Sequence, residues 1–170
     1  MKKRTVEKDV SILSVFLEVG IFCIFLVLVF RFLLIPGGVN GSSMEPTLSD
    51  GARVLCRGSI FGQPQVGDIV IVDDVLGKGS HIIKRVIAVG GDTIDIRDGQ
   101  VFRNEELLDE PYAKTPTEII FGTEYPMVVP EDSYFVMGDN REVSIDSRDP
   151  DVGTVAKKKI RGVYLLTILK

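Results

Sequence analysis

The hydrophobic and polar positions of this 170-residue chain divide it into two unlike parts. Residues 10–35 are apolar almost throughout, and Glu18 and Arg31 are their only charges. As a helix this segment would be roughly 39 Å long, which exceeds the hydrocarbon core of a bilayer at about 30 Å. The pattern therefore predicts a transmembrane helix over residues 10–35, with Glu18 and Arg31 near opposite membrane surfaces.

Two other interpretations of this apolar segment are weaker. A cleaved signal peptide would be followed by a small-x-small site, but the chain continues FLLIPGGVNG. A buried core helix in so small a domain would not be apolar on all faces. The basic residues of segment 1–9 (Lys2, Lys3, Arg4 and Lys8) have no counterpart between residues 36 and 52. The positive-inside rule then predicts a cell-membrane protein with residues 1–9 in the cytoplasm and 36–170 outside.

Beyond the helix, the pattern is typical of short β-strands. Pro36-Gly37-Gly38 is expected to end the helix and begin a loop. Asp98-Gly99 lies between two strand-like runs and predicts a hairpin. Residues 105–130 contain four prolines and are expected to form an irregular excursion. β-Branched, alternating runs predict strands at 53–57, 68–73, 81–89, 93–97, 100–104, 133–137 and 163–169. The fold class is therefore mostly β: a compact sheet or barrel-like domain preceded by one transmembrane helix.

Charge and composition exclude several kinds of site. Twenty basic and 24 acidic residues give a net charge of -4, which argues against nucleic-acid binding. Cys23 and Cys56 do not form a disulfide framework, and His81 is the only histidine. We therefore expect neither a metal nor a cofactor.

Three polar segments could carry chemistry. In GSSMEPTL (41–48), Ser43 follows Gly41, which permits close approach of another backbone, although serines in loops usually cap turns. In KRVIAVGGD (84–92), strand alternation gives Lys84 the same face as three apolar residues, Ile82, Val86 and Ala88. The polar loop GDNREVSIDSRD (138–149) is either a charged surface turn or a network that orients other side chains.

Lys84 is a candidate general base for Ser43. Desolvation would lower its pKa from about 10.4 towards neutrality, and a neutral amine can accept a proton. The alternative is a lysine whose ammonium reaches solvent at a strand end. His81 is the other candidate base, but it lies three positions away and points to the opposite face, so only one of the two can serve Ser43. A Ser–Lys dyad is an accepted variant of serine hydrolase catalysis.

The motifs SSMEPTL, KRVIAVGGD and GDNREVSIDSR, in this order behind one helix, resemble bacterial type I signal peptidases of the S26 serine protease family. GDIVIV and VPEDSYFVMGDNR extend the resemblance over nearly the whole chain. Lys84, where eukaryotic relatives have histidine, favours the bacterial type, and the short chain resembles the compact Gram-positive form.

The resemblance implies a role for each matching residue. Ser43 would be the nucleophile, its backbone amide an oxyanion donor, and Lys84 the general base. Ser144 would orient Lys84, Asp146 would pair with Arg148, and Arg85 would pair with Asp139. In one branch of the family a serine two positions before the nucleophile gives a second oxyanion donor. Gly41 occupies that position here, so the identity of this donor stays open.

The family's substrates are secreted preproteins cut after small-x-small sites, typically Ala-x-Ala. An extended substrate would lie beside residues 81–84 and 39–42. The implied partners are these preproteins, the lipid bilayer and the export machinery. Shallow pockets are expected from Val39, Met44, Leu48, Ile82 and Ile83.

Two other functions compete with this one. A self-cleaving repressor of the LexA type also uses a Ser–Lys pair, but it would carry a DNA-binding region where this chain has an apolar helix. A non-catalytic anchored β-domain could bind exported chains or wall components. The joint presence of Ser43, Lys84 and Ser144 argues against that non-catalytic domain.

Overall fold

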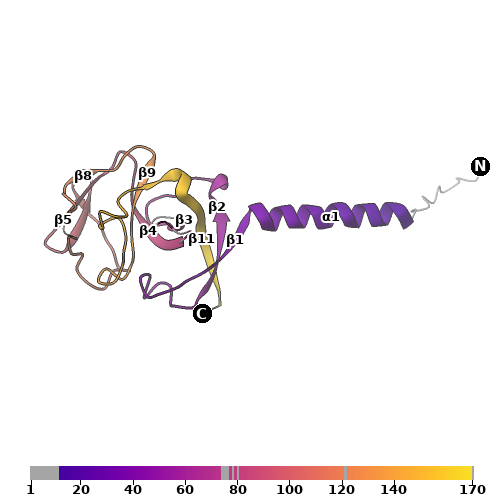
Figure 1. The fold of residues 1–170 in the computed structure, drawn as a ribbon, viewed down its shortest axis with the longest axis horizontal. Helices are drawn as coiled ribbons and strands as arrows, with labels where there is room; N and C mark the ends of the chain where they lie inside the picture. Colours follow the sequence, from indigo (N-terminus) through magenta and orange to yellow (C-terminus); the bar gives the residue numbers. More distant parts are fainter. Residues whose placement is uncertain (1–11, 74–76, 78, 80, 121, 170) are drawn as a thin grey trace, which may run out of the picture.

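One helix and a β-domain make up the part of the chain that the computed structural model describes, which is residues 12–73, 77, 79, 81–120 and 122–169 (Figure 1). Residues 1–9, predicted to be cytoplasmic, lie outside that part. The elements in chain order are α1 (Ile12–Phe32), β1 (Leu34–Gly38), β2 (Arg53–Gly58), the 3-10 helix η1 (Ser59–Phe61), β3 (Ile69–Asp73), β4 (His81–Val89), β5 (Thr93–Arg97), β6 (Gln100–Arg103), β7 (Glu106–Leu107), β8 (Met127–Val128), β9 (Ser133–Met137), β10 (Val155–Ala156), η2 (Lys157–Lys159) and β11 (Ile160–Leu169).

Helix α1 extends away from the strands (Figure 1). Its span Ile12–Phe30 is long and apolar enough to cross a membrane, and none of it is buried against the described part of the chain. A buried core helix is therefore excluded. The helix ends at Phe32, before the predicted end at residue 35.

The loop predicted at residues 36–38 is wrong, because Pro36, Gly37 and Gly38 belong to strand β1. β1 pairs with β2 alone and forms an edge of its sheet, where a proline without an N–H is tolerated. A Cβ built on Gly37 would come within 3.2 Å of both Ile71 and Val54, so glycine lets this strand lie close to its neighbours. β1 thus joins the helix directly to the segment that carries Ser43.

The strands form two antiparallel sheets, which confirms the mostly-β prediction. The larger sheet has the order β1-β2-β11-β3-β4-β9-β10, and the smaller has β7-β6-β5-β8. The predicted strands at 53–57, 68–73, 81–89, 93–97, 100–104 and 133–137 are present to within one residue, whereas β11 begins three residues earlier than expected. Asp98 and Gly99 both have positive φ, as a type I′ hairpin requires. Residues 105–130 are irregular apart from β7 and β8 among those described.

The core fixes the segment that carries Ser43. Met44 and Leu48, at 1% and 2% exposure, pack in one buried cluster with Val54 of β2 and Ile71 of β3. The burial of Met44 and Leu48 holds the turn between them against the sheet. Ser43 therefore sits on a backbone whose position is set by core packing.

Candidate active site

Ser43 and Lys84 lie in hydrogen-bond contact. Lys84 Nζ donates to Ser43 Oγ at 2.7 Å, although the two residues are 41 positions apart. Ser43 comes from the turn after β1, and Lys84 from the middle of β4. His81 is instead exposed and pairs with Asp73, with Nδ1 and Oδ1 2.9 Å apart. The geometry favours Lys84 over His81 as the base.

Burial sets the charge of Lys84. The residue is 4% exposed and lies opposite the fully buried Val70 on β3. Desolvation lowers its pKa from 10.5 to about 8, partly opposed by the negative charge of Asp146. A substantial fraction of this amine is therefore neutral near physiological pH.

The apolar face predicted around Lys84 is only partly correct. Ile82 and Val86 pack in the same cluster as Val70. Ala88 packs in a different cluster with Phe135, because a β-bulge between Val86 and Ala88 shifts the pairing of β4 with β9. The bulge turns the strand after Val86, where simple alternation fails.

A buried ion pair lies near Lys84. Arg148 Nε and Asp146 Oδ1 are 2.9 Å apart, and the two side chains are 1% and 0% exposed. Asp146 also accepts the amide of Gly138, and Arg148 donates to the carbonyl of Arg141 at 2.8 Å. These bonds satisfy the hydrogen-bonding needs of the buried charges and connect residues at the beginning and the end of loop 138–148.

Arg85 and Asp139 form a second, bidentate pair. Arg85 Nε and Nη2 lie 2.8 Å and 2.6 Å from the two oxygens of Asp139, which also accepts the hydroxyl of Thr47. Arg85 in turn lies 4.0 Å over the ring of Tyr112, from the excursion. The Arg85–Asp139 pair thus links β4, the Ser43 segment and the excursion. No specific signal in the sequence pointed to the parts played by Thr47 and Tyr112.

Ser144 is buried, but its Oγ has no hydrogen-bond partner in the described part of the chain. The hydrogen bond to Lys84 that the resemblance implied is therefore not formed here, where Lys84 Nζ donates to Ser43. A Cβ on Gly138 would lie 2.3 Å from Ser144 Oγ and 2.5 Å from the Ser43 carbonyl oxygen. Only glycine fits at position 138, a requirement that sequence reasoning missed even though Gly138 opens the polar loop.

The backbone of Gly41, two positions before Ser43, has a defined conformation and a hydrogen-bond partner. Gly41 has φ +87°, and its amide donates to Asp50 Oδ1 at 2.7 Å. That N–H is therefore engaged by a carboxylate. A Cβ at this position would meet open space, so side-chain crowding does not explain the glycine.

A small pocket of about 80 Å³ adjoins the Ser43–Lys84 pair. Val39, Met44, Ile82 and Ile83 line it, as predicted from the sequence, together with Gly38, Asn40, His81 and the two central residues. Leu48 does not line it. It packs in the core cluster that also contains Met44, and its contact with substrate stays a prediction.

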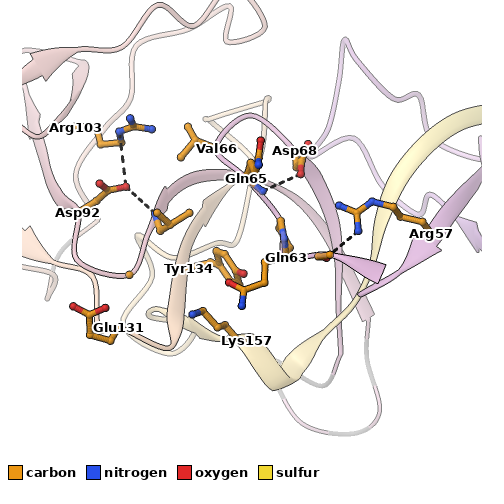
Figure 2. Close-up of a pocket in the computed structure, with 14 residues that line it drawn as sticks. Arg57, Gln63, Gln65, Val66, Asp68, Asp92, Arg103, Glu131, Tyr134 and Lys157 are labelled. Atoms are coloured by element: carbon orange, nitrogen blue, oxygen red, sulfur yellow. Dashed lines mark hydrogen bonds and ion pairs between the residues drawn. The ribbon is translucent and has the colours of Figure 1, made fainter. Parts of the chain in front are cut away.

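A larger cavity lies elsewhere in the described part of the chain. It measures about 850 Å³ and contains neither Ser43 nor Lys84. Figure 2 shows two contacts between its charged and polar residues, Asp68 with Gln65 and Asp92 with Arg103. Arg57 donates to the carbonyl of Gly62. Because a nucleophile in contact with a base identifies a reactive site better than volume does, we assign the candidate site to the small pocket.

Comparisons with known proteins show the family to which the chain is similar. The family described as "Signal peptidase, peptidase S26" matches residues 12–169. Signal peptidase I of Bacillus licheniformis is 35% identical over 95% of this chain and 90% of its own length. Signal peptidase I S of Bacillus subtilis (strain 168) is 36% identical over 95% and 91%. A solved signal peptidase I from Enterococcus faecalis V583 is 29% identical, with a TM-score of 0.48, over 60% of this chain and 97% of that one.

Proposed function

This chain belongs to the S26 family of signal peptidases, and we propose that Ser43 and Lys84 are its catalytic pair. As a family member it is a serine endopeptidase that acts on the signal peptides of preproteins. The observation that carries the proposal is the 2.7 Å contact between Ser43 Oγ and the buried amine of Lys84.

The first half of the reaction forms an acyl-enzyme. Neutral Lys84 takes the proton of Ser43 Oγ as that oxygen attacks the carbonyl carbon of the scissile peptide bond. The tetrahedral oxyanion receives a hydrogen bond from the Ser43 amide. The Lys84 ammonium then returns its proton to the leaving nitrogen. The C–N bond breaks, and the mature protein departs with a new amino terminus.

The second half releases the signal peptide. Lys84, neutral again, takes a proton from water, whose oxygen attacks the ester carbonyl on Ser43. Collapse of this intermediate breaks the ester bond, returns the proton to Ser43 Oγ and frees the signal peptide as a carboxylate. Lys84 thus acts as base and acid in each half-reaction.

The buried polar residues around the pair would position it. We assign to Ser144 the role of accepting a hydrogen bond from Lys84 once acylation removes Ser43 Oγ as its partner, because the Ser144 hydroxyl is buried and unpartnered in the described chain. The Asp146–Arg148 pair fixes the loop that presents Ser144. The Arg85–Asp139 pair holds β4 against the turn that carries Ser43.

The second oxyanion donor is not the Gly41 amide in this proposal, because Asp50 already accepts that N–H. Loss of one such donor costs about 2.7–4 kcal/mol in other serine proteases, so a bound water or another amide would have to supply it.

The substrate would bind as an added strand. β3 pairs with β4 from His81 to Arg85, but β9 pairs only from Arg85 onward, which leaves one edge of His81–Lys84 unpaired in the described chain. An extended peptide can bond to that edge. The adjoining pocket of about 80 Å³ has room for small side chains only, which supports cleavage after small-x-small sequences.

The anchor would hold residues 36–170 outside the membrane and the N-terminus in the cytoplasm. An apolar helix in a signal peptidase family member indicates membrane anchoring, and the basic N-terminal segment supports this orientation. Gly58 donates to the carbonyl of Leu33 at the end of α1, and the next turn exposes Ile60 (73%) and Phe61 (50%). We expect these two side chains to contact the bilayer.

The other functions are less well supported. Family membership over residues 12–169 argues against a repressor of the LexA type and a wall-binding domain. Contact with the export machinery and absence of nucleic-acid binding stay predictions, the latter resting on the net charge of -4.

Cleavage of a preprotein by the full-length protein in detergent micelles tests the proposal. Ser43→Ala and Lys84→Met should each lose activity by several orders of magnitude. Ser42→Ala is the matched control, because it removes the neighbouring hydroxyl without touching Lys84, and it should keep activity. Near-wild-type cleavage by Ser43→Ala or Lys84→Met would refute the dyad.

A further inference from the structure

A second cavity flanks the segment that carries Ser43. It measures about 430 Å³, within the range of about 300–1,000 Å³ typical of ligand pockets. Glu45, Pro46, Lys114 and Asn140 line it, and it shares no residue with the small pocket beside Lys84. We call it the exit pocket.

A groove that adjoins the small pocket indicates the direction in which a substrate would lie. The small pocket shares Gly38 and His81 with a groove of about 280 Å³ that reaches Ile35, just after the end of the anchor helix at Phe32. The apolar part of a signal peptide lies in the bilayer, so the residues before the scissile bond would approach from this membrane side. The residues after it would leave across the other flank of Ser43, over the exit pocket.

The wall of the exit pocket is fixed relative to the nucleophile. The Asn140 amide donates to the Ser43 carbonyl at 3.0 Å, and its side-chain amide donates to the Ser42 carbonyl at 3.3 Å. Asp139, also in the wall, is wholly buried and neutralised by Arg85. A peptide in this pocket would therefore contact a rigid surface. Because Asp139 is neutralised, the unpaired charges of that surface belong to residues other than Asp139.

Two such charges face the pocket. Glu45 and Lys114 are exposed, and neither forms an ion pair in the part of the chain that the structure describes. We propose that the exit pocket binds the first residues of the mature protein and selects their side chains by charge, with Lys114 favouring acidic residues and Glu45 favouring basic ones. This inference rests on the proposed cleavage of preproteins and adds a site for the part of the substrate beyond the scissile bond.

Two substrates that differ only after the cleavage site test the proposal. Both carry the same signal peptide, and the second and third mature residues are Asp in one and Lys in the other. The readout is the ratio of kcat/KM for the Asp substrate to that for the Lys substrate, measured with the full-length protein in micelles. Effects of a mutation on folding or on the chemical step cancel in this ratio.

Lys114→Glu should lower the ratio by about three- to tenfold, because exposed charge pairs have modest energies and reversal replaces attraction by repulsion. Glu45→Lys should raise it. Lys158→Glu and Glu106→Lys make the same charge changes at exposed positions outside the pocket, and should leave the ratio as in wild type. A ratio that does not change with Lys114→Glu and Glu45→Lys, while both substrates are cut, would overturn the exit pocket alone. No cleavage of either substrate by the wild-type protein would overturn the proposed function and the pocket with it.

Discussion

Titration of Lys84 should give the cleavage rate a rising limb centred near pH 8. Burial lowers the pKa of this amine from 10.5 to about 8. At pH 7 a pKa of about 8 leaves roughly a tenth of the amine neutral, whereas a pKa of 10.5 would leave about one molecule in 3,000. The buried site thus supplies about 300 times more of the reactive base at that pH, provided that the neutral amine is the form that reacts.

The assay is kcat/KM for one preprotein from pH 6 to pH 10, with the full-length protein in micelles. The substrate should carry no titratable side chain near the cleavage site, so that the limb reports on the enzyme. Tenfold activity gain per pH unit is expected well below pH 8, followed by a plateau above it. A flat profile, or a limb that continues to rise towards pH 10.5, would refute the reasoning from burial.

Three further predictions follow from the same structure. Lys84→Met should raise the free energy of unfolding at pH 7 by up to about 3 kcal/mol, because the folded state holds a lysine whose pKa lies below its unfolded value. Wild-type stability should rise between about pH 8 and pH 10.5, so the gain should vanish near pH 10.5; an equal gain at every pH would contradict this in calorimetry. Ser144→Ala should lower kcat and KM together, by about two- to tenfold, and should increase the acyl-enzyme burst, because deacylation loses the hydrogen bond that orients neutral Lys84; a fall in kcat/KM without a larger burst would argue for a merely structural role. Ile60→Ser with Phe61→Ser should slow cleavage of a vesicle-embedded preprotein but not of a soluble peptide, and equal slowing of both would exclude a bilayer contact for this turn.

Much of the fold could be predicted from local sequence, because strand alternation and turn chemistry are local signals. β4 and β5 cover the predicted runs rich in β-branched residues, and Asp98-Gly99 marks the hairpin that follows β5. β1 could not be predicted, since Pro36-Gly37-Gly38 is typical of a loop and becomes a strand only through its pairing with β2. The bulge in β4 likewise depends on the partner strand β9, which is why the face of Ala88 was wrong.

The candidate site was likewise predictable only where its signals are local in sequence. Strand alternation indicated a desolvated Lys84, and the polar loop after β9 indicated an orienting network. The contact of Lys84 with Ser43 joins elements far apart in sequence, so chain spacing could not give it. Whether Leu48 lines the small pocket could not be predicted either, because an apolar residue near a nucleophile can face a pocket or the core, and periodicity does not distinguish the two in a turn. Gly138 was missed because its requirement comes from the packing of Ser144 and the Ser43 carbonyl.

The most direct test of the Ser43–Lys84 assignment is to locate the covalent intermediate. A single-turnover reaction with a preprotein, quenched in acid and digested, can be examined by mass spectrometry for a signal peptide joined through an ester. The account predicts this ester on Ser43 in the wild-type protein and in Ser42→Ala, and its absence in Ser43→Ala and in Lys84→Met. An ester on Ser42, or undiminished cleavage by Ser43→Ala, would contradict it.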